Sequence, residues 1–315
     1  MEDRSDRILF LFVDGVGLAP ASAENPLAIL PTPHLRRLLG GPLTVEQIQV
    51  GDQLALVALD ATLGVPGLPQ SATGQTALFT GENGALLLGH HATAYPGPRL
   101  RALIREHGLF KRALAAGLEA TFANPFTPEY LAALDGERLP ASVTTWAART
   151  GGLRLRDLDD LRRGQAVAWD ICRDHFAARS GVDVEPVEPE TAGEHLAALA
   201  AAHDLTVYET FLTDLAAHRR FGLRVEEAVE RLDGLLGGAL RRRSPGVTLL
   251  LTSDHGNLED ATQPLHTRNP VPLLAVGPAA PRFAALRSIL EVTPAILAVL
   301  EAAKLARQPR RSGRT

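Results

Sequence analysis

Residues 9–17 read LFLFVDGVG, an apolar run that ends in one acidic residue and two glycines. Because both faces of the run are apolar, it predicts a central strand of a parallel sheet with helices on both sides. Gly15 and Gly17 let the backbone turn tightly beside Asp14. Open parallel sheets bind ligands beyond the carboxyl ends of their strands. A buried Asp is costly there unless it is paired or coordinated, so Asp14 is the first candidate site residue.

Two later apolar runs also end in side chains that bind metals. The candidates are Asp214 and His218 in residues 206–218 (TVYETFLTDLAAH), Asp254 and His255 in residues 247–257 (VTLLLTSDHGN), and His266 in residues 265–272 (LHTRNPVP). Asp214 and His218 share one face if they lie in a helical turn. The adjacent Asp254 and His255 need the turn that the following Gly-Asn offers. With Asp14, these side chains can hold two divalent cations.

A serine follows the second predicted strand, which covers residues 53–62 (QLALVALDAT). The Gly/Pro-rich turn GVPGLPQ leads to Ser71, and TGQTALFTG then predicts the start of a helix. Such a strand, turn and helix aim backbone N–H groups at whatever the serine carries. Thr73 and Thr76 are rival hydroxyls in the same turn. Ser71 is the candidate nucleophile.

The predicted elements alternate at both ends of the chain. Residues 204–252 predict a strand, a helix and a strand, and residues 271–277 and 289–304 predict a further strand and helix. These elements indicate an α/β fold with a mostly parallel sheet. Residues 96–200 are rich in Ala, Leu and Arg and predict mainly helices, near 99–117, 127–135, 155–163 and 190–203. We therefore expect a discontinuous metal-binding core, 1–95 and 201–315, with an inserted helical cap over 96–200.

Composition excludes several classes of function. The 315 residues are 45% apolar and 22% charged, as in globular domains, and 32 basic against 36 acidic residues give no excess for nucleic-acid binding. A single cysteine rules out a disulfide framework within one chain. The N-terminal MEDRSDR does not have the pattern of a signal peptide, and no apolar stretch reaches about 18 residues. We expect a cytoplasmic protein that binds no membrane; nothing in the sequence predicts an oligomeric state.

Together the motifs resemble a known family, the alkaline phosphatase superfamily, in the branch of the cofactor-independent phosphoglycerate mutase and phosphopentomutase metalloenzymes. The resemblance rests on VDGVG (13–17), GLPQSATGQTALFTG (67–81), TDLAAH (213–218), TSDHGNLED (252–260) and PLHTRNPVPLLAVG (264–277). It implies an alkaline phosphatase-like core, mostly parallel with helices on both faces, and leaves the middle of the chain unmatched. Family members commonly have His after the turn glycine, where this chain has Gln75.

The resemblance also implies a role for each candidate. Asp214, His218 and His266 would hold one metal, and Asp14, Asp254 and His255 the other. Ser71 would coordinate the second metal and attack phosphorus, because it occupies the nucleophile position of the family turn. Imidazole and carboxylate ligands suit Mn²⁺ or Zn²⁺ better than Mg²⁺, and the resemblance favours manganese.

These roles predict a two-metal phosphoryl-transfer enzyme that acts on a small phosphorylated metabolite through a phosphoserine at Ser71. Attack by water on that intermediate would make it a phosphatase, and attack by a substrate hydroxyl a phosphomutase. The alternatives are a nucleotide phosphodiesterase or pyrophosphatase-type hydrolase of the same superfamily, and a non-catalytic metal-binding relative. A sulfatase is disfavoured because Ala-Thr-Gly-Gln follows Ser71.

Overall fold

The computed structural model describes residues 6–136 and 138–307. The first five residues and the last eight, which belong to the predicted N-terminal pattern and to the end of the predicted core, lie outside the described residues. Within the described ranges, no helix is both long and apolar enough to cross a membrane.

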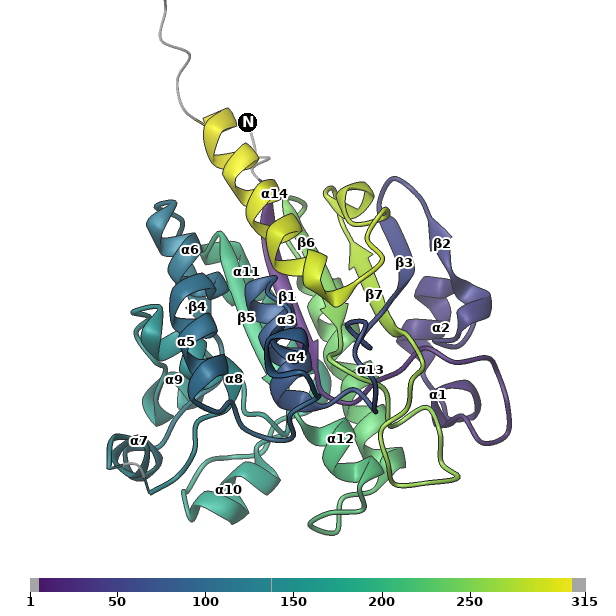
Figure 1. Cartoon of the computed structure of the whole chain (residues 1–315), viewed down its shortest axis with the longest axis horizontal. Coiled ribbons are helices and arrows are strands. Elements are labelled where there is room, and N and C mark those ends of the chain that lie inside the picture. The colour runs from purple at the N-terminus through teal and green to yellow at the C-terminus, as the bar shows by residue number, and fades with distance from the viewer. Residues whose placement is uncertain (1–5, 137, 308–315) are drawn as a thin grey trace, which may run out of the picture.

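A seven-stranded sheet forms the centre of the molecule, in the order β2-β3-β7-β6-β1-β5-β4 (Figure 1). The strands are Arg7–Val13 (β1), Gln49–Val50 (β2), Leu54–Leu59 (β3), Ala120–Phe122 (β4), Leu205–Thr210 (β5), Val247–Thr252 (β6) and Val271–Val276 (β7). β4, β5, β1 and β6 are parallel, whereas β7 is antiparallel to both β6 and β3, and β2 is antiparallel to β3. The predicted mostly parallel sheet is confirmed.

β1 is buried on both faces, as its uniformly apolar sequence predicts. Phe10 and Phe12 belong to one hydrophobic cluster, whereas Leu9 and Leu11 belong to a second cluster on the opposite face. Phe79 of α3 (Ser71–Thr80) and Leu300 of α14 (Val292–Arg307) pack in the first cluster. Leu196 of α11 (Pro189–Ala202) and Leu236 of α13 (Val225–Arg242) pack in the second. Figure 1 shows α3 and α14 in front of the sheet, with α11 and α13 behind it.

The helices account for most of the remaining chain. The α-helices are Pro26–Ile29 (α1), Pro33–Leu39 (α2), Ser71–Thr80 (α3), Gly84–Leu88 (α4), Pro98–His107 (α5), Leu109–Ala115 (α6), Pro128–Asp135 (α7), Val143–Thr150 (α8), Leu158–Arg162 (α9), Asp174–Ser180 (α10), Pro189–Ala202 (α11), Leu212–Ala217 (α12), Val225–Arg242 (α13) and Val292–Arg307 (α14). Three 3-10 turns cover Val45–Gln47 (η1), Ala280–Arg282 (η2) and Ile289–Glu291 (η3).

The middle segment, residues 96–200, is mainly helical, as its composition predicts. It contains α5 to α11, of which α8 and α10 were not predicted from the sequence. It also supplies β4, which pairs in parallel with β5 at the edge of the sheet. Phe110, Phe122 and Val143 from this segment pack in the same hydrophobic cluster as Phe10. Part of the segment is therefore built onto the sheet; its division from the core as a cap stays a prediction.

Candidate metal centre

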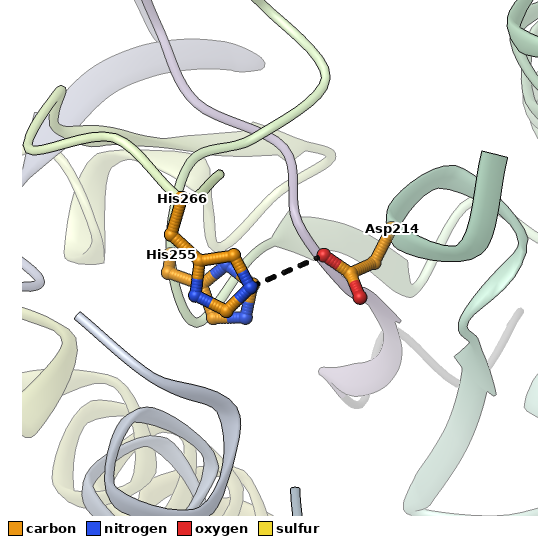
Figure 2. Close-up of side chains that lie close together, drawn as sticks. All are labelled: Asp214, His255 and His266. Carbon is orange, nitrogen blue, oxygen red and sulfur yellow. Dashed lines mark ion pairs between the residues drawn. The ribbon is translucent and has the colours of Figure 1, made fainter. Parts of the chain in front are cut away.

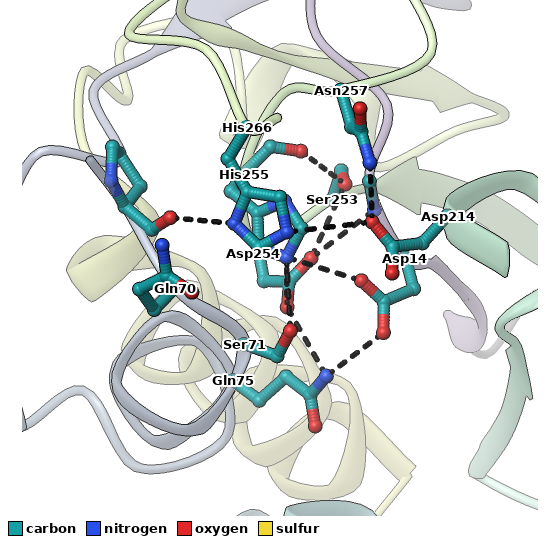
Figure 3. A network of polar contacts seen from close by, with 12 residues as sticks. Asp14, Gln70, Ser71, Gln75, Asp214, Ser253, Asp254, His255, Asn257 and His266 are labelled. Carbon is teal, nitrogen blue, oxygen red and sulfur yellow. Dashed lines mark hydrogen bonds and ion pairs between the residues drawn. The ribbon is translucent and has the colours of Figure 1, made fainter. Parts of the chain in front are cut away.

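The carboxyl ends of β5, β1 and β6 lie side by side, so the segments that follow them meet. Phe12 of β1 stands opposite Glu209 of β5 and Thr252 of β6. Asp14, two residues beyond Phe12, consequently lies between Asp214 in α12 and Asp254 after β6 (Figure 3). The parallel register brings together Asp14 and Asp254, which are 240 positions apart in the sequence.

Asp14, Asp254 and His255 form one buried group. His255 Nε2 lies 3.2 Å from Asp14 Oδ1 and 3.5 Å from Asp254 Oδ2. The hydroxyl of Ser71, the first residue of α3, lies 3.0 Å from the same nitrogen. The structure thus brings the candidate nucleophile into the group that the resemblance assigns to it.

Asp214, His218 and His266 form a second group beside the first. His218 Nε2 lies 3.1 Å from His266 Nε2 and 3.4 Å from Asp214 Oδ1, and His266 Nε2 lies 3.6 Å from that oxygen. Asp214 lies in the first turn of α12 and His218 at its carboxyl end, so the two side chains meet the condition of a helical turn that would place them on one face. His255 stacks on His266 with ring centroids 3.7 Å apart, and Asp214 faces both rings (Figure 2). The two groups therefore meet at His255.

Backbone and amide contacts orient these ligands. His218 Nδ1 contacts the carbonyl of Pro264 at 2.7 Å, and His266 Nδ1 contacts the carbonyl of Pro69 at 2.8 Å. A carbonyl at Nδ1 selects the tautomer that leaves Nε2 free for the centre of the site. Asn257 donates to Asp214 Oδ1 from 2.9 Å. The side chains are oriented in the way that outer contacts orient metal ligands.

The electrostatics of the cluster suit cations. Burial raises the pKa of Asp14, and the charges of Asp254 and Asp214 raise it further. Burial likewise raises the pKa of Asp254. Although burial opposes a charged imidazole, the charges of Asp254 and Asp14 raise the pKa of His255 to about 10. Among the described side chains, only histidines form ion pairs with the three carboxylates. An acidic buried cluster with oxygen and nitrogen donors fits divalent metal ions.

The rival hydroxyls point away from the cluster. Thr73 donates to the backbone carbonyl of Gln70 at 3.1 Å, and Thr76 donates to that of Ala72 at 2.6 Å. Each bond holds the hydroxyl against the backbone at the start of its own helix. The geometry therefore favours Ser71 over either threonine as the nucleophile.

Glu259 holds three of the ligand-bearing loops together, a role that the sequence analysis missed. Its Oε2 accepts from the backbone N–H groups of Gly17 and Asn257, each at 2.8 Å. Its Oε1 accepts from the side chains of Thr267 and Asn269. A Cβ at Gly17 would lie 2.1 Å from Glu259 Oε1, so only glycine allows this approach. The sequence signal was a charged residue inside a loop otherwise rich in ligands and turn residues.

We expect Glu259→Gln to lower the free energy of unfolding by about 3 kcal/mol and to weaken metal binding. In the variant, an amide NH₂ group would face donors that the Glu259 carboxylate accepts from in the parent. Hydrogen bonds to charged groups are among the stronger ones, so their loss is costly. Chemical denaturation and Mn²⁺ titration would measure both effects. Glu301→Gln on an exposed position of α14 is the control. Equal behaviour of the two variants would contradict this role.

Glu209 is a second buried acid that the sequence analysis did not single out. It lies on β5, 2% exposed, where Oε2 accepts from the Thr144 hydroxyl at 2.5 Å and Oε1 has no hydrogen-bond partner. Asn124 brackets its backbone, donating to the carbonyl and accepting from the N–H. Burial raises the pKa of Glu209 from 4.5 to about 8.

We expect the stability of metal-free protein to fall between pH 4.5 and 8 because of Glu209. In this window the folded chain keeps a proton that the unfolded chain has lost, so rising pH favours unfolding. Glu209→Gln removes this titration, and its stability relative to the parent should rise across the window by at most about 5 kcal/mol. Urea unfolding at several pH values, with chelator present, would measure the difference. A pH-independent difference would refute the assignment.

Residues 177–304 match the model of the Metalloenzyme superfamily. The 2,3-bisphosphoglycerate-independent phosphoglycerate mutase of Cereibacter sphaeroides is 31% identical over 122 residues, which cover 36% of this chain and 24% of that one. The phosphopentomutase of Chromohalobacter salexigens is 42% identical over 85 residues, covering 26% of this chain and 20% of the relative. The chain thus spans about a quarter or less of the length of these curated relatives.

Solved structures with similar folds align over nearly the whole chain. A Pyrococcus horikoshii protein aligns with a TM-score of 0.53 at 13% identity, covering 98% of this chain and 99% of that one. A cold-active alkaline phosphatase from Shewanella sp. aligns with a TM-score of 0.50 at 13% identity, covering 92% and 99%. At these identities the likeness concerns the fold alone. The sequence matches confirm, over part of the chain, the predicted resemblance to metalloenzymes of the branch of the two mutases. The solved structures confirm the alkaline phosphatase-like fold.

Proposed function

We propose that the chain is a metal-dependent phosphoryl-transfer enzyme of the alkaline phosphatase superfamily that acts on a small phosphorylated metabolite. The observation that carries the proposal is the Ser71 hydroxyl, 3.0 Å from His255 Nε2 at the edge of a cluster of six candidate ligands, five of which are buried. A nucleophilic hydroxyl beside such a cluster suits formation of a phosphoserine. The enzyme would be a phosphatase or a phosphomutase.

Each candidate ligand has a place in this proposal. Asp14, Asp254 and His255, together with Ser71, would hold one cation, and Asp214, His218 and His266 the other. Mn²⁺ is favoured, with Zn²⁺ as the alternative, because the donors are carboxylates and imidazoles. When bound, such cations supply Lewis-acid stabilisation of phosphoryl oxygens and lower the pKa of a coordinated hydroxyl.

The chain itself supplies the nucleophile and its orientation. Ser71 is the first residue of α3, a ten-residue helix whose N-cap residue, Gln70, makes no side-chain capping bond. The first backbone N–H groups of α3 are therefore available to phosphoryl oxygens, which helix N-termini bind well. Ser71 Oγ would form the bond to phosphorus while the bond to the leaving oxygen breaks and that oxygen keeps the electron pair.

The second half of the reaction separates the two proposed activities. Water attacking the phosphoserine releases phosphate, whereas a hydroxyl of the bound substrate regains the phosphoryl group at a new position. Both curated relatives described above are named as mutases, which supports the transfer reaction.

Intact-protein mass spectrometry tests the intermediate. The protein is incubated with Mn²⁺ and one class of compound at a time: phosphorylated sugars, glycerates or nucleotides. We expect one compound class to add the mass of one phosphate to the parent chain and nothing to the Ser71→Ala variant. That class identifies the substrate, and the fate of the phosphate distinguishes hydrolysis from transfer. Turnover with no mass gain, even in rapidly quenched samples, would argue against a phosphoserine.

A further inference from the structure

Gln75 lies one helical turn after Ser71 and on the same face of α3. Its side chain is buried, at 3% exposure, among the candidate ligands. The amide nitrogen donates to Asp14 Oδ2 at 3.2 Å and to Asp254 Oδ2 at 3.1 Å (Figure 3). One side chain thus bridges two carboxylates that follow different strands, β1 and β6. This is the position where the family resemblance leads one to expect His.

The amide suits this bridge for a simple chemical reason. Its NH₂ group carries two protons and no net charge, so each carboxylate can receive one hydrogen bond. The amide does not titrate, so both donors are present at every pH at which the protein folds. A neutral imidazole has one N–H, and an imidazolium would add a charge that competes with a cation. Gln75 brings the two carboxylates together without taking up the negative charge that attracts a metal.

The surroundings of Gln75 fix which end of the amide faces the carboxylates. Gln75 Oε1 is buried and has no hydrogen-bond partner. A flip of the amide would place this oxygen against Asp14 and Asp254, which are acceptors when ionised. The helix itself is also held close, because a Cβ at Gly74 would lie 2.6 Å from the Asp254 carbonyl oxygen. The bridge therefore has one stable orientation and little freedom to move away.

We propose that Gln75 is a positioning residue that prearranges Asp14 and Asp254 for the cation they share. This inference rests on the proposed function for the presence of that cation. The two donors occupy the Oδ2 atoms and hold the carboxylates at a fixed separation before metal binding. The energy of bringing the two acidic groups together is thereby partly offset in the metal-free protein. The consequence is a higher metal affinity of this site than the same ligands would have without the bridge.

Calorimetric titration of metal-free full-length protein with Mn²⁺ tests this inference. We expect Gln75→Leu, which removes both donors at similar volume, to weaken one of two Mn²⁺ sites by about 10–100-fold. The other site should change much less. Gln75→His should restore part of the affinity because it returns one donor, and this affinity should depend on pH because imidazole, unlike the amide, titrates. Gln75→Met, which is unbranched, replaces the Leu variant if that one does not fold.

A variant in the same helix separates positioning from general damage. Thr76→Val removes a buried hydroxyl that donates to the Ala72 carbonyl, away from the cluster. It should bind Mn²⁺ like the parent. Parent-like affinity of folded Gln75→Leu, or an equal loss in Thr76→Val, would overturn the inference. Failure of the proposed function would look different, because the parent protein itself would then bind no pair of Mn²⁺ ions or form no phosphoserine.

Discussion

Ser71→Ala is expected to reduce metal-dependent turnover of a phosphomonoester by about 10³-fold or more, as loss of a nucleophile does in other enzymes that form covalent intermediates. The variant lacks the hydroxyl that lies 3.0 Å from His255 Nε2, and no other hydroxyl in this turn faces the cluster. Steady-state kinetics with p-nitrophenyl phosphate at saturating Mn²⁺ would measure the loss. The folded state of the variant should be retained, because Ser71 is a partly buried helix-start residue without a capping role.

Thr73→Val is the matched control for this experiment. It removes a hydroxyl two residues away that donates to the Gln70 carbonyl instead of facing the ligands. We expect Thr73→Val to retain activity within about tenfold, since the loss of one hydrogen bond costs roughly 1 kcal/mol. Full activity of Ser71→Ala, or complete loss of activity in Thr73→Val alone, would show that Ser71 is not the nucleophile.

Asp254→Asn is expected to have opposite effects on stability with and without metal. In the presence of chelator, the substitution should raise the free energy of unfolding, because it removes one of three buried carboxylates that repel one another. Mn²⁺ at about 100 times its dissociation constant should stabilise the parent by about 2.7 kcal/mol. The variant, which lacks a ligand of that cation, should gain much less. The order of stability would then reverse on addition of Mn²⁺.

The pH dependence of the metal-free protein follows from the same carboxylates. The pKa values of Asp14 and Asp254 are raised in the folded chain, so the folded state binds protons that the unfolded state has released. The free energy of unfolding should consequently fall as the pH rises above 3.8, the ordinary pKa of Asp, and Asp254→Asn should make this fall shallower. Thermal unfolding with chelator or Mn²⁺ at several pH values would show both effects. Asp52→Asn, at an exposed position, is the control; similar responses of the two variants would contradict a metal site at Asp254.

The predictions from local pattern were accurate where the pattern itself is strong. The run LFLFVDGVG became β1, the runs before Asp214 and Asp254 became β5 and β6, and Ser71 begins α3. These segments are largely apolar or begin at clear turn signals, so their preference for strand or helix can be read from the local sequence. The strand β4 was missed because it is three residues long and depends on pairing with β5. The helices α8 and α10 were also missed. α8 begins with Val-Thr-Thr, three β-branched residues of low helix propensity, and α10 is only seven residues long.

The sequence by itself determined which residue types stand at the ends of the buried strands, and therefore which chemistry the chain can attempt. Only the tertiary structure decided that Asp14 lies between the other clusters, that His255 joins the two groups, and that Glu259 and Gln75 hold the ligands in place. The hydrogen bonds from Gln75 to Asp254 and from Gly17 to Glu259 span 179 and 242 residues of sequence. Contacts of that kind follow from strand order and register, which depend on the free energy of the whole fold and have no local sequence signal.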